Sequence, residues 1–154
     1  MVTVPVNDVK NPPLAGVTGE TLASLSAVLD ALQANVAVLD SRGTIVLTNV
    51  AWRQFSLAYS PLYGRTTPDS DVGVNYLEVS SRCPDPHDES VIAVQGIRDV
   101  LAGRMNAFSL TYPCHTPTDQ VWFTMTVTPL IWQGKRGALV AHADTTPRHR
   151  LSRD

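Results

Sequence analysis

Residues 34–49 read Ala-Asn-Val-Ala-Val-Leu-Asp-Ser-Arg-Gly-Thr-Ile-Val-Leu-Thr-Asn, which is two apolar, β-branched runs around a short polar segment. Runs of this composition favour β-strands. Ser41-Arg42-Gly43 forms the turn between them, because a glycine can adopt the positive φ that a tight turn requires. The stretch therefore predicts a β-hairpin, with strands over Ala34–Asp40 and Thr44–Thr48.

Helices are predicted on both sides of this hairpin. Asn49 is a good N-cap for a short amphipathic helix whose first apolar residues are Ala51, Trp52 and Phe55. Upstream, a helix is expected to begin near Thr18, and its leucines recur at heptad spacing: Leu22, Leu25, Leu29 and Leu32. This leucine seam is too short for a stable coiled coil alone, so it contributes to a dimer or packs on its own domain.

The middle of the chain is predicted to be helical. Asn75–Cys83 is expected to form one short helix. Asp85-Pro86 is typical of a helix start, and Gly103 of a helix end. One face of this second helix would be traced by Val91, Val94, either Ile97 or Arg98, and Leu101.

Three further strands are predicted towards the C-terminus. Apolar and polar residues alternate over Phe108–Tyr112 and again over Val121–Thr128, which is the period of a half-buried strand. Gln133-Gly134-Lys135 forms a turn before a last strand over Gly137–Ala143. The order of elements predicts an α+β fold with a single five-stranded antiparallel sheet, helices on one face and an N-terminal flanking helix.

The composition excludes several classes of protein. The chain has 154 residues, of which 44% are hydrophobic and 17% charged, so it can bury a core. The net charge of −2 does not suit a protein whose main partner is nucleic acid, and two cysteines are too few for a disulfide scaffold. The sequence shows neither a signal peptide nor a run of ~18 apolar residues, so a cytoplasmic location is expected.

The hairpin and the residues after it resemble the opening of a PAS domain. The pattern "V-x-x-x-D-x-x-G-x-I-x-x-x-N" is met by Val36, Asp40, Gly43, Ile45 and Asn49. Asn49-Val50-Ala51 with Phe55 is similar to the start of the family's first core helix, and Gly73-Val74-Asn75-Tyr76 occupies the position of the next short helix. Ala143-Asp144-Thr145-Thr146 is similar to the family's "D-I-T" exit, with Thr145 in place of the usual Ile.

The resemblance implies a domain plan and a role. Residues 1–17 would be an extended arm, 18–33 a flanking and dimerisation helix, 34–144 the PAS core, and 145–154 an exit linker towards a signalling helix. The chain is expected to be part of a longer bacterial signalling protein. It would sense a small ligand or a partner and act as a homodimer, without catalytic activity. The change would pass through the flanking helices to a histidine kinase, a cyclic-dinucleotide enzyme or a transcription regulator. Asp144 and Thr146 would mark the signal exit.

A haem- or flavin-bearing redox or gas sensor is the alternative. The flavin photosensors of the family need a reactive Cys after the Asn of Gly73-Val74-Asn75, where this chain has Tyr76, so at most non-covalent flavin is expected. Haem would need an axial histidine, and Cys83-Pro84 matches a short element associated with haem regulation. The sequence leaves open a sensing role for Cys83, Cys114, His115 and His142. We expect no resident cofactor. We also expect no metal site, because Cys114 and His115 are adjacent, and the side chains of strand neighbours point to opposite faces.

Candidate pocket residues lie on the predicted strands and on the short helix. They either line a ligand pocket between sheet and helices or form a plain packed core: Val38, Tyr76, Phe108, Leu110, Tyr112, Phe123, Met125 and Val140.

Overall fold

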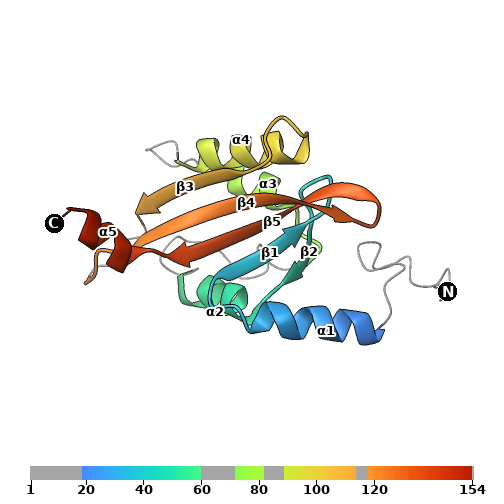
Figure 1. The fold of residues 1–154 in the computed structure, drawn as a ribbon, viewed down its shortest axis with the longest axis horizontal. Helices are drawn as coiled ribbons and strands as arrows, with labels where there is room; N and C mark the ends of the chain where they lie inside the picture. Colours follow the sequence, from blue (N-terminus) through green and yellow to red (C-terminus); the bar gives the residue numbers. More distant parts are fainter. Residues whose placement is uncertain (1–18, 60–71, 82–88, 114–117, 154) are drawn as a thin grey trace.

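The computed structural model describes residues 19–59, 72–81, 89–113 and 118–153. Their strands form a five-stranded antiparallel sheet in the order β2-β1-β5-β4-β3 (Figure 1). The strands are β1 (Asn35–Leu39), β2 (Ile45–Thr48), β3 (Phe108–Pro113), β4 (Trp122–Trp132) and β5 (Lys135–Asp144). The predicted α+β fold is confirmed. The last strand, β5, lies at the centre of the sheet, between β1 and β4.

The helices divide between the two faces of the sheet. They are α1 (Gly19–Asp30), α2 (Val50–Tyr59), α3 (Tyr76–Ser81), α4 (Glu89–Leu101) and α5 (Thr146–Arg153). Side chains of α2, α3 and α4 pack on one face, called the inner face, whereas α1 packs on the opposite, outer face. The expected arm, Thr18 at the expected start of the first helix, and the Asp85-Pro86 helix start lie outside the described residues.

Two turns close the hairpins as the sequence predicts. In the first, the Asp40 carboxylate accepts the backbone N–H groups of Arg42 at 2.9 Å and Thr44 at 3.0 Å, and Gly43 has a φ of 87°. In the second, Gln133 and Gly134 both have positive φ, as a two-residue hairpin turn demands.

Strand β4 runs further than the predicted Val121–Thr128. It continues through Pro129, a residue that cannot donate a hydrogen bond to a neighbouring strand. Because β3 pairs with β4 only as far as Val127, one edge of β4 is free at Pro129. A proline is tolerated at such an edge, so the strand need not end there.

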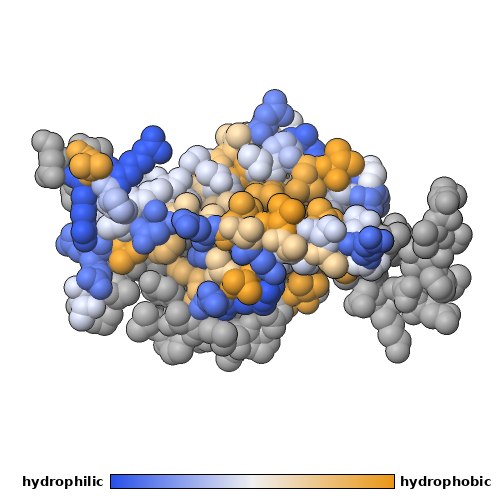
Figure 2. Space-filling view, turned by 60° about the horizontal axis from the view of Figure 1, so that its bottom comes forward, coloured by the Kyte–Doolittle hydropathy of each residue, from blue (hydrophilic) through white to orange (hydrophobic). Residues whose placement is uncertain are grey.

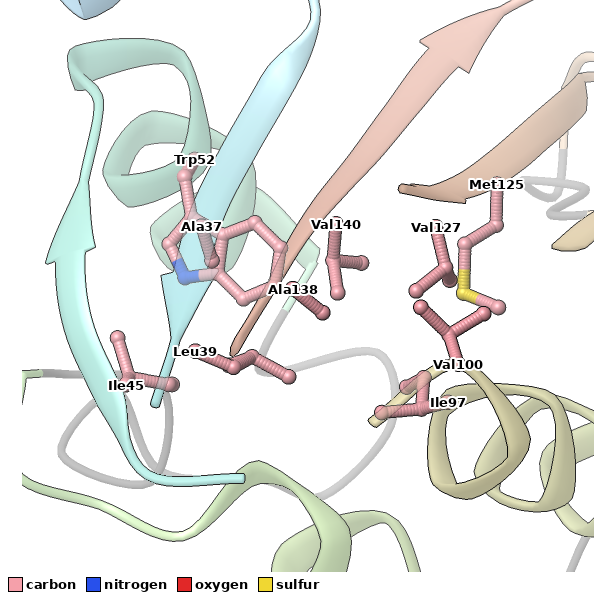
Figure 3. Close-up of a cluster of buried hydrophobic side chains, with 10 residues drawn as sticks. All are labelled: Ala37, Leu39, Ile45, Trp52, Ile97, Val100, Met125, Val127, Ala138 and Val140. Atoms are coloured by element: carbon pink, nitrogen blue, oxygen red, sulfur yellow. The ribbon is translucent and has the colours of Figure 1, made fainter. Parts of the chain in front are cut away.

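The inner face carries the larger of two apolar clusters. Figure 3 shows its buried side chains, with Ile97 and Val100 of α4 directed towards Met125 and Val127 of β4. The predicted α4 face is wrong at Val91, which is 60% exposed. The helix is rotated because Gly96 lies against β3, where an added Cβ would be 2.5 Å from the Phe108 ring. This close approach turns Val94, Ile97 and Val100 inwards.

The smaller apolar cluster lies on the outer face, under α1. Leu22 and Leu29 of the leucine seam pack against Val38, Val46 and Leu47. The other two leucines of the seam point elsewhere, since Leu25 is 39% and Leu32 45% exposed. Two leucines of the seam therefore pack inside the domain, and the other two are exposed to solvent.

Candidate functional site

His142 of β5 lies on the inner face, hydrogen-bonded at both ring nitrogens. Its Nδ1 is 2.6 Å from the Tyr112 hydroxyl and its Nε2 is 3.3 Å from the Tyr76 hydroxyl. Tyr112 comes from the edge strand β3, and Tyr76 is the first residue of α3. The imidazole thus joins a helix, an edge strand and the central strand of the sheet.

Aromatic rings surround this histidine. The Trp52 ring centroid lies 5.7 Å from that of His142 and 5.6 Å from that of Tyr76. Tyr112 meets His142 edge-on at 5.8 Å and stacks on Phe123 at 6.2 Å. Phe55 contacts Phe123 in turn, with ring centroids 5.2 Å apart. We call these six residues the aromatic cluster; its ring distances are those of favourable aromatic pairs.

The electrostatics of the cluster keep His142 neutral. Burial among the rings lowers the pKa of His142 from 6.5 to about 4, because the charged imidazolium loses its hydration there. A neutral imidazole carries one N–H donor and one acceptor nitrogen. One tyrosine hydroxyl therefore donates to His142 and the other accepts from it, and the site can both donate and accept towards a third group.

The structure brings together seven of the eight predicted pocket residues. Cross-strand pairing places Leu110 opposite Met125 and Tyr112 opposite Phe123, on the inner face. Tyr76 and Phe108 pack against the inner cluster, which also contains Val140. Val38 is not brought together with them, because it lies in the outer cluster beneath α1.

Sequence reasoning missed Trp52 and Phe55 as members of this cluster and left His142 undecided. A signal was present in both cases. Trp52 and Phe55 are three residues apart and share one helix face, as their burial and contacts show. His142 continues the alternation of Ala138 and Val140 along β5, and both of these residues are buried in the inner cluster.

The predicted exit residues follow His142 along the chain: Asp144 ends β5 two residues later, and Thr146 is the first residue of α5. The Thr146 N–H donates to the Asp144 carboxylate at 2.9 Å, which caps α5. The Thr146 hydroxyl accepts the Trp122 N–H at 2.9 Å, and the Thr145 N–H donates to the Trp122 carbonyl at 2.9 Å. The start of α5 is thereby fixed to the beginning of β4.

The other cysteine and histidine candidates, Cys83, Cys114 and His115, fall in parts of the chain that the structure does not describe. Among the residues that the structure describes, His, Cys, Asp and Glu side chains form no group of three or more that could hold a metal ion. Within the same part of the chain, every helix is too short or too polar to cross a lipid bilayer.

Comparison with known proteins gives a family and several relatives. Residues 29–150 match a family model described as PAS fold. An uncharacterised 104.1 kDa protein in the hypE 3′ region of Rhodobacter capsulatus is 39% identical over 136 residues. That alignment covers 83% of this chain and 13% of the relative, so the chain spans only a small part of the relative's length.

Two solved structures show the same fold. The PAS domain of Bordetella pertussis BvgS is 17% identical with a TM-score of 0.50, over 88% of this chain and 93% of that domain. The phage VqmA protein, solved in complex with DPO, is 18% identical with a TM-score of 0.52, over 87% of this chain and 57% of that one.

Proposed function

The chain belongs to the PAS fold family, and on this premise we propose that it is the sensory module of a bacterial signal-transduction protein. It binds a small ligand at the aromatic cluster and passes the change to an output domain. The observation that carries the proposal is His142, which is bonded to tyrosines of α3 and β3 and lies two residues before the Asp144 cap of α5. A ligand that replaces one of the two tyrosines as the hydrogen-bond partner of His142 acts directly on β5, the strand that leads to α5.

The chemistry of the cluster favours a neutral, flat ligand. Its members are aromatic rings, whose faces stack on planar molecules. Its polar groups are a neutral imidazole and two phenol hydroxyls, which give and receive hydrogen bonds without supplying a charge. A charged ligand would lose hydration here with no counter-charge from these groups.

We propose a diffusible ligand in preference to haem. A haem iron would need a free nitrogen of His142, and both nitrogens are engaged by tyrosine hydroxyls. Ligation would therefore have to break one of these bonds. The proposal includes no resident cofactor and no catalytic step, and an absorbance spectrum of the purified protein that shows a haem or flavin band would contradict it.

The output domain is proposed to follow in a longer protein. The Rhodobacter relative supports this, since the matched region makes up 13% of its length. A histidine kinase, a cyclic-dinucleotide enzyme and a transcription regulator are the output classes we propose. We also propose a cytoplasmic homodimer, which brings two such outputs together.

Thermal shift measurements test the ligand proposal. Indole, phenol and benzamide serve as neutral probes, with benzoate and benzylammonium as charged counterparts of benzamide. A ligand that binds the native state alone raises the melting temperature by mass action. We expect the neutral probes to raise it in the wild type, and to do so less in His142→Gln.

The controls separate this site from others. Ile131→Gln changes an exposed residue on β4 and should leave the shifts unchanged. Equal shifts in His142→Gln and the wild type would place the binding elsewhere. If none of the neutral probes shifts the wild type, the neutral-ligand proposal fails, and a partner protein becomes the better candidate for the sensed signal.

A further inference from the structure

We infer that three threonine hydroxyls couple the aromatic cluster to the exit helix α5. The Thr111 hydroxyl lies 2.9 Å from that of Thr124, and the Thr124 hydroxyl lies 2.9 Å from that of Thr145. This threonine relay runs from the edge strand β3, across β4, to the residue just before α5. The inference rests on the proposed function, because the state of the aromatic cluster is its input.

The geometry of the sheet brings the three hydroxyls together. Thr111 and Thr124 are direct cross-strand partners, so their side chains stand side by side on the outer face. Thr124 also pairs with Ala143 of β5, and the chain reaches Thr145 two residues later. Thr124 and Thr145 are half-buried, while Thr111 is exposed.

A row of hydroxyls transmits orientation as well as position. Each hydroxyl has one proton to donate, so the direction of one bond limits the direction of the next. Hydrogen bonds in a chain also polarise one another. A change at Thr111 therefore alters whether the Thr124 hydroxyl donates a hydrogen bond to Thr145 or accepts one from it.

The input end of the relay is adjacent to the aromatic cluster. Tyr112, whose hydroxyl lies 2.6 Å from His142, directly follows Thr111 on β3 and points to the opposite face of the sheet. In the sheet order β3 is an edge strand, paired with β4 alone. A shift of Tyr112 at the inner face is thus carried by the backbone to Thr111 at the outer face.

The output end lies at the anchor of α5. The Thr145 N–H is bonded to the Trp122 carbonyl, and its hydroxyl adds a second bond to β4 through Thr124. An isoleucine at position 145 would keep the first bond and lose the second. The relay is therefore a property of the threonine that this chain carries there.

A competing route runs along β5 itself, from His142 to the Asp144 cap. The two routes predict different results when the cluster is disturbed in a variant whose threonine relay is broken. Coupling through the relay is then lost, whereas coupling along β5 remains. Disturbing the cluster by mutation requires no ligand. The test of the threonine relay is therefore independent of whether a ligand binds at the cluster.

Amide hydrogen exchange of Thr145 and Thr146, measured by NMR on the whole chain, reports on the anchor. Both amides are hydrogen-bonded in the native structure. Tyr112→Phe removes the bond to His142, and we expect exchange at these amides to become about fivefold faster, which corresponds to one ordinary hydrogen bond. In a Thr124→Val background the same change should add less than about twofold, because the relay is already broken.

Matched variants make the experiment specific. Thr126→Val lies on the same strand and face as Thr124 and should keep the full response to Tyr112→Phe. Thr145→Val should abolish the response from the exit side, whereas Thr145→Ser, which keeps the hydroxyl, should retain it. These exit-side variants also serve if Thr124→Val fails to fold.

Two results would overturn the inference. The first is an equal increase in amide exchange at Thr145 and Thr146 after Tyr112→Phe, whether or not the Thr124 hydroxyl is present. This result would assign the coupling to β5. The second is no response to Tyr112→Phe at all in the wild-type background.

Discussion

The imidazole of His142 is held between two phenol hydroxyls in a buried position that disfavours its charged form. Burial lowers its pKa to about 4, although the unperturbed group titrates at 6.5. At neutral pH the residue is therefore a fixed hydrogen-bonding group and not a charge. A bound molecule would meet the same neutral imidazole over the whole physiological range.

This burial predicts a dependence of stability on pH. Between pH 6.5 and about 4 the unfolded chain binds a proton at this residue and the folded chain does not. The free energy of unfolding must then fall as the pH falls through this window, by up to about 3 kcal/mol from His142. Urea denaturation at a series of pH values measures the slope.

A His142→Gln variant isolates this contribution. Glutamine can still hydrogen-bond to the tyrosines but does not titrate, so the variant should lose less stability than the wild type as the pH falls. The other ionisable groups contribute to both proteins and cancel in the difference. Parallel pH profiles would show that His142 is protonated equally in the folded and unfolded chains.

Asn49 shows how a single side chain can join three elements. Its amide oxygen accepts the backbone N–H groups of Val36 and Trp52, both at 2.9 Å. Its amide nitrogen donates to the carbonyls of Leu29 at 2.9 Å and Ala34 at 2.8 Å. The side chain, which is fully buried, thus ties the end of α1 to the start of β1 and caps α2.

Removing this side chain should be costly. Asn49→Ala removes four hydrogen bonds made by a buried side chain, and we expect it to lower the free energy of unfolding by about 3 kcal/mol or more. Asn75 provides a matched control, because it caps α3 in the same way with an exposed bond to Glu78. Asn75→Ala should cost about 1 kcal/mol, the usual value of an N-cap. Equal losses in the two variants, measured by urea denaturation, would contradict the hub role of Asn49.

The outer surface of the molecule carries an exposed apolar stripe on α1 and just after it. Leu25 and Val28 of α1 are 39% and 64% exposed, and Leu32, just after the end of α1, is 45% exposed, whereas Leu22 and Leu29 pack on the sheet. Figure 2 turns the side of the molecule that carries α1 and α2 towards the viewer and shows hydrophobic side chains gathered near its middle. An exposed apolar stripe of this kind is typical of an association surface.

The expected homodimer can be tested on this stripe. Leu25→Asp in α1 combined with Leu32→Asp just after it places charge on exposed positions, so the fold should survive while association is lost. Leu29 is avoided because it supports the sheet. Sedimentation equilibrium over a range of concentrations measures the mass, with Ile131→Asp, 71% exposed on β4, as the control. A wild type that stays monomeric at every concentration would rule out the dimer.

Much of this molecule is encoded in short stretches of its sequence. The turn at Gly43, the cap at Asn49, the alternation along β3 and the end of α4 at Gly103 each depend on a few neighbouring residues. Steric limits on φ and the periods of helix and strand act within these stretches, so the elements and the α+β class could be predicted. The same alternation places the strand residues Phe108, Leu110, Tyr112, Phe123, Met125 and Val140 on one face of the sheet.

Other features depend on contacts between residues that are far apart in the chain. Tyr76 and Tyr112 meet His142 across sequence separations of 66 and 30 residues, and no local pattern specifies that meeting. The central place of β5, the rotation of α4 about Gly96 and the division of the leucine seam on α1 likewise arise from packing. A local pattern indicates that one face of an element is apolar. Which element covers that face depends on how the whole chain packs into a dense interior.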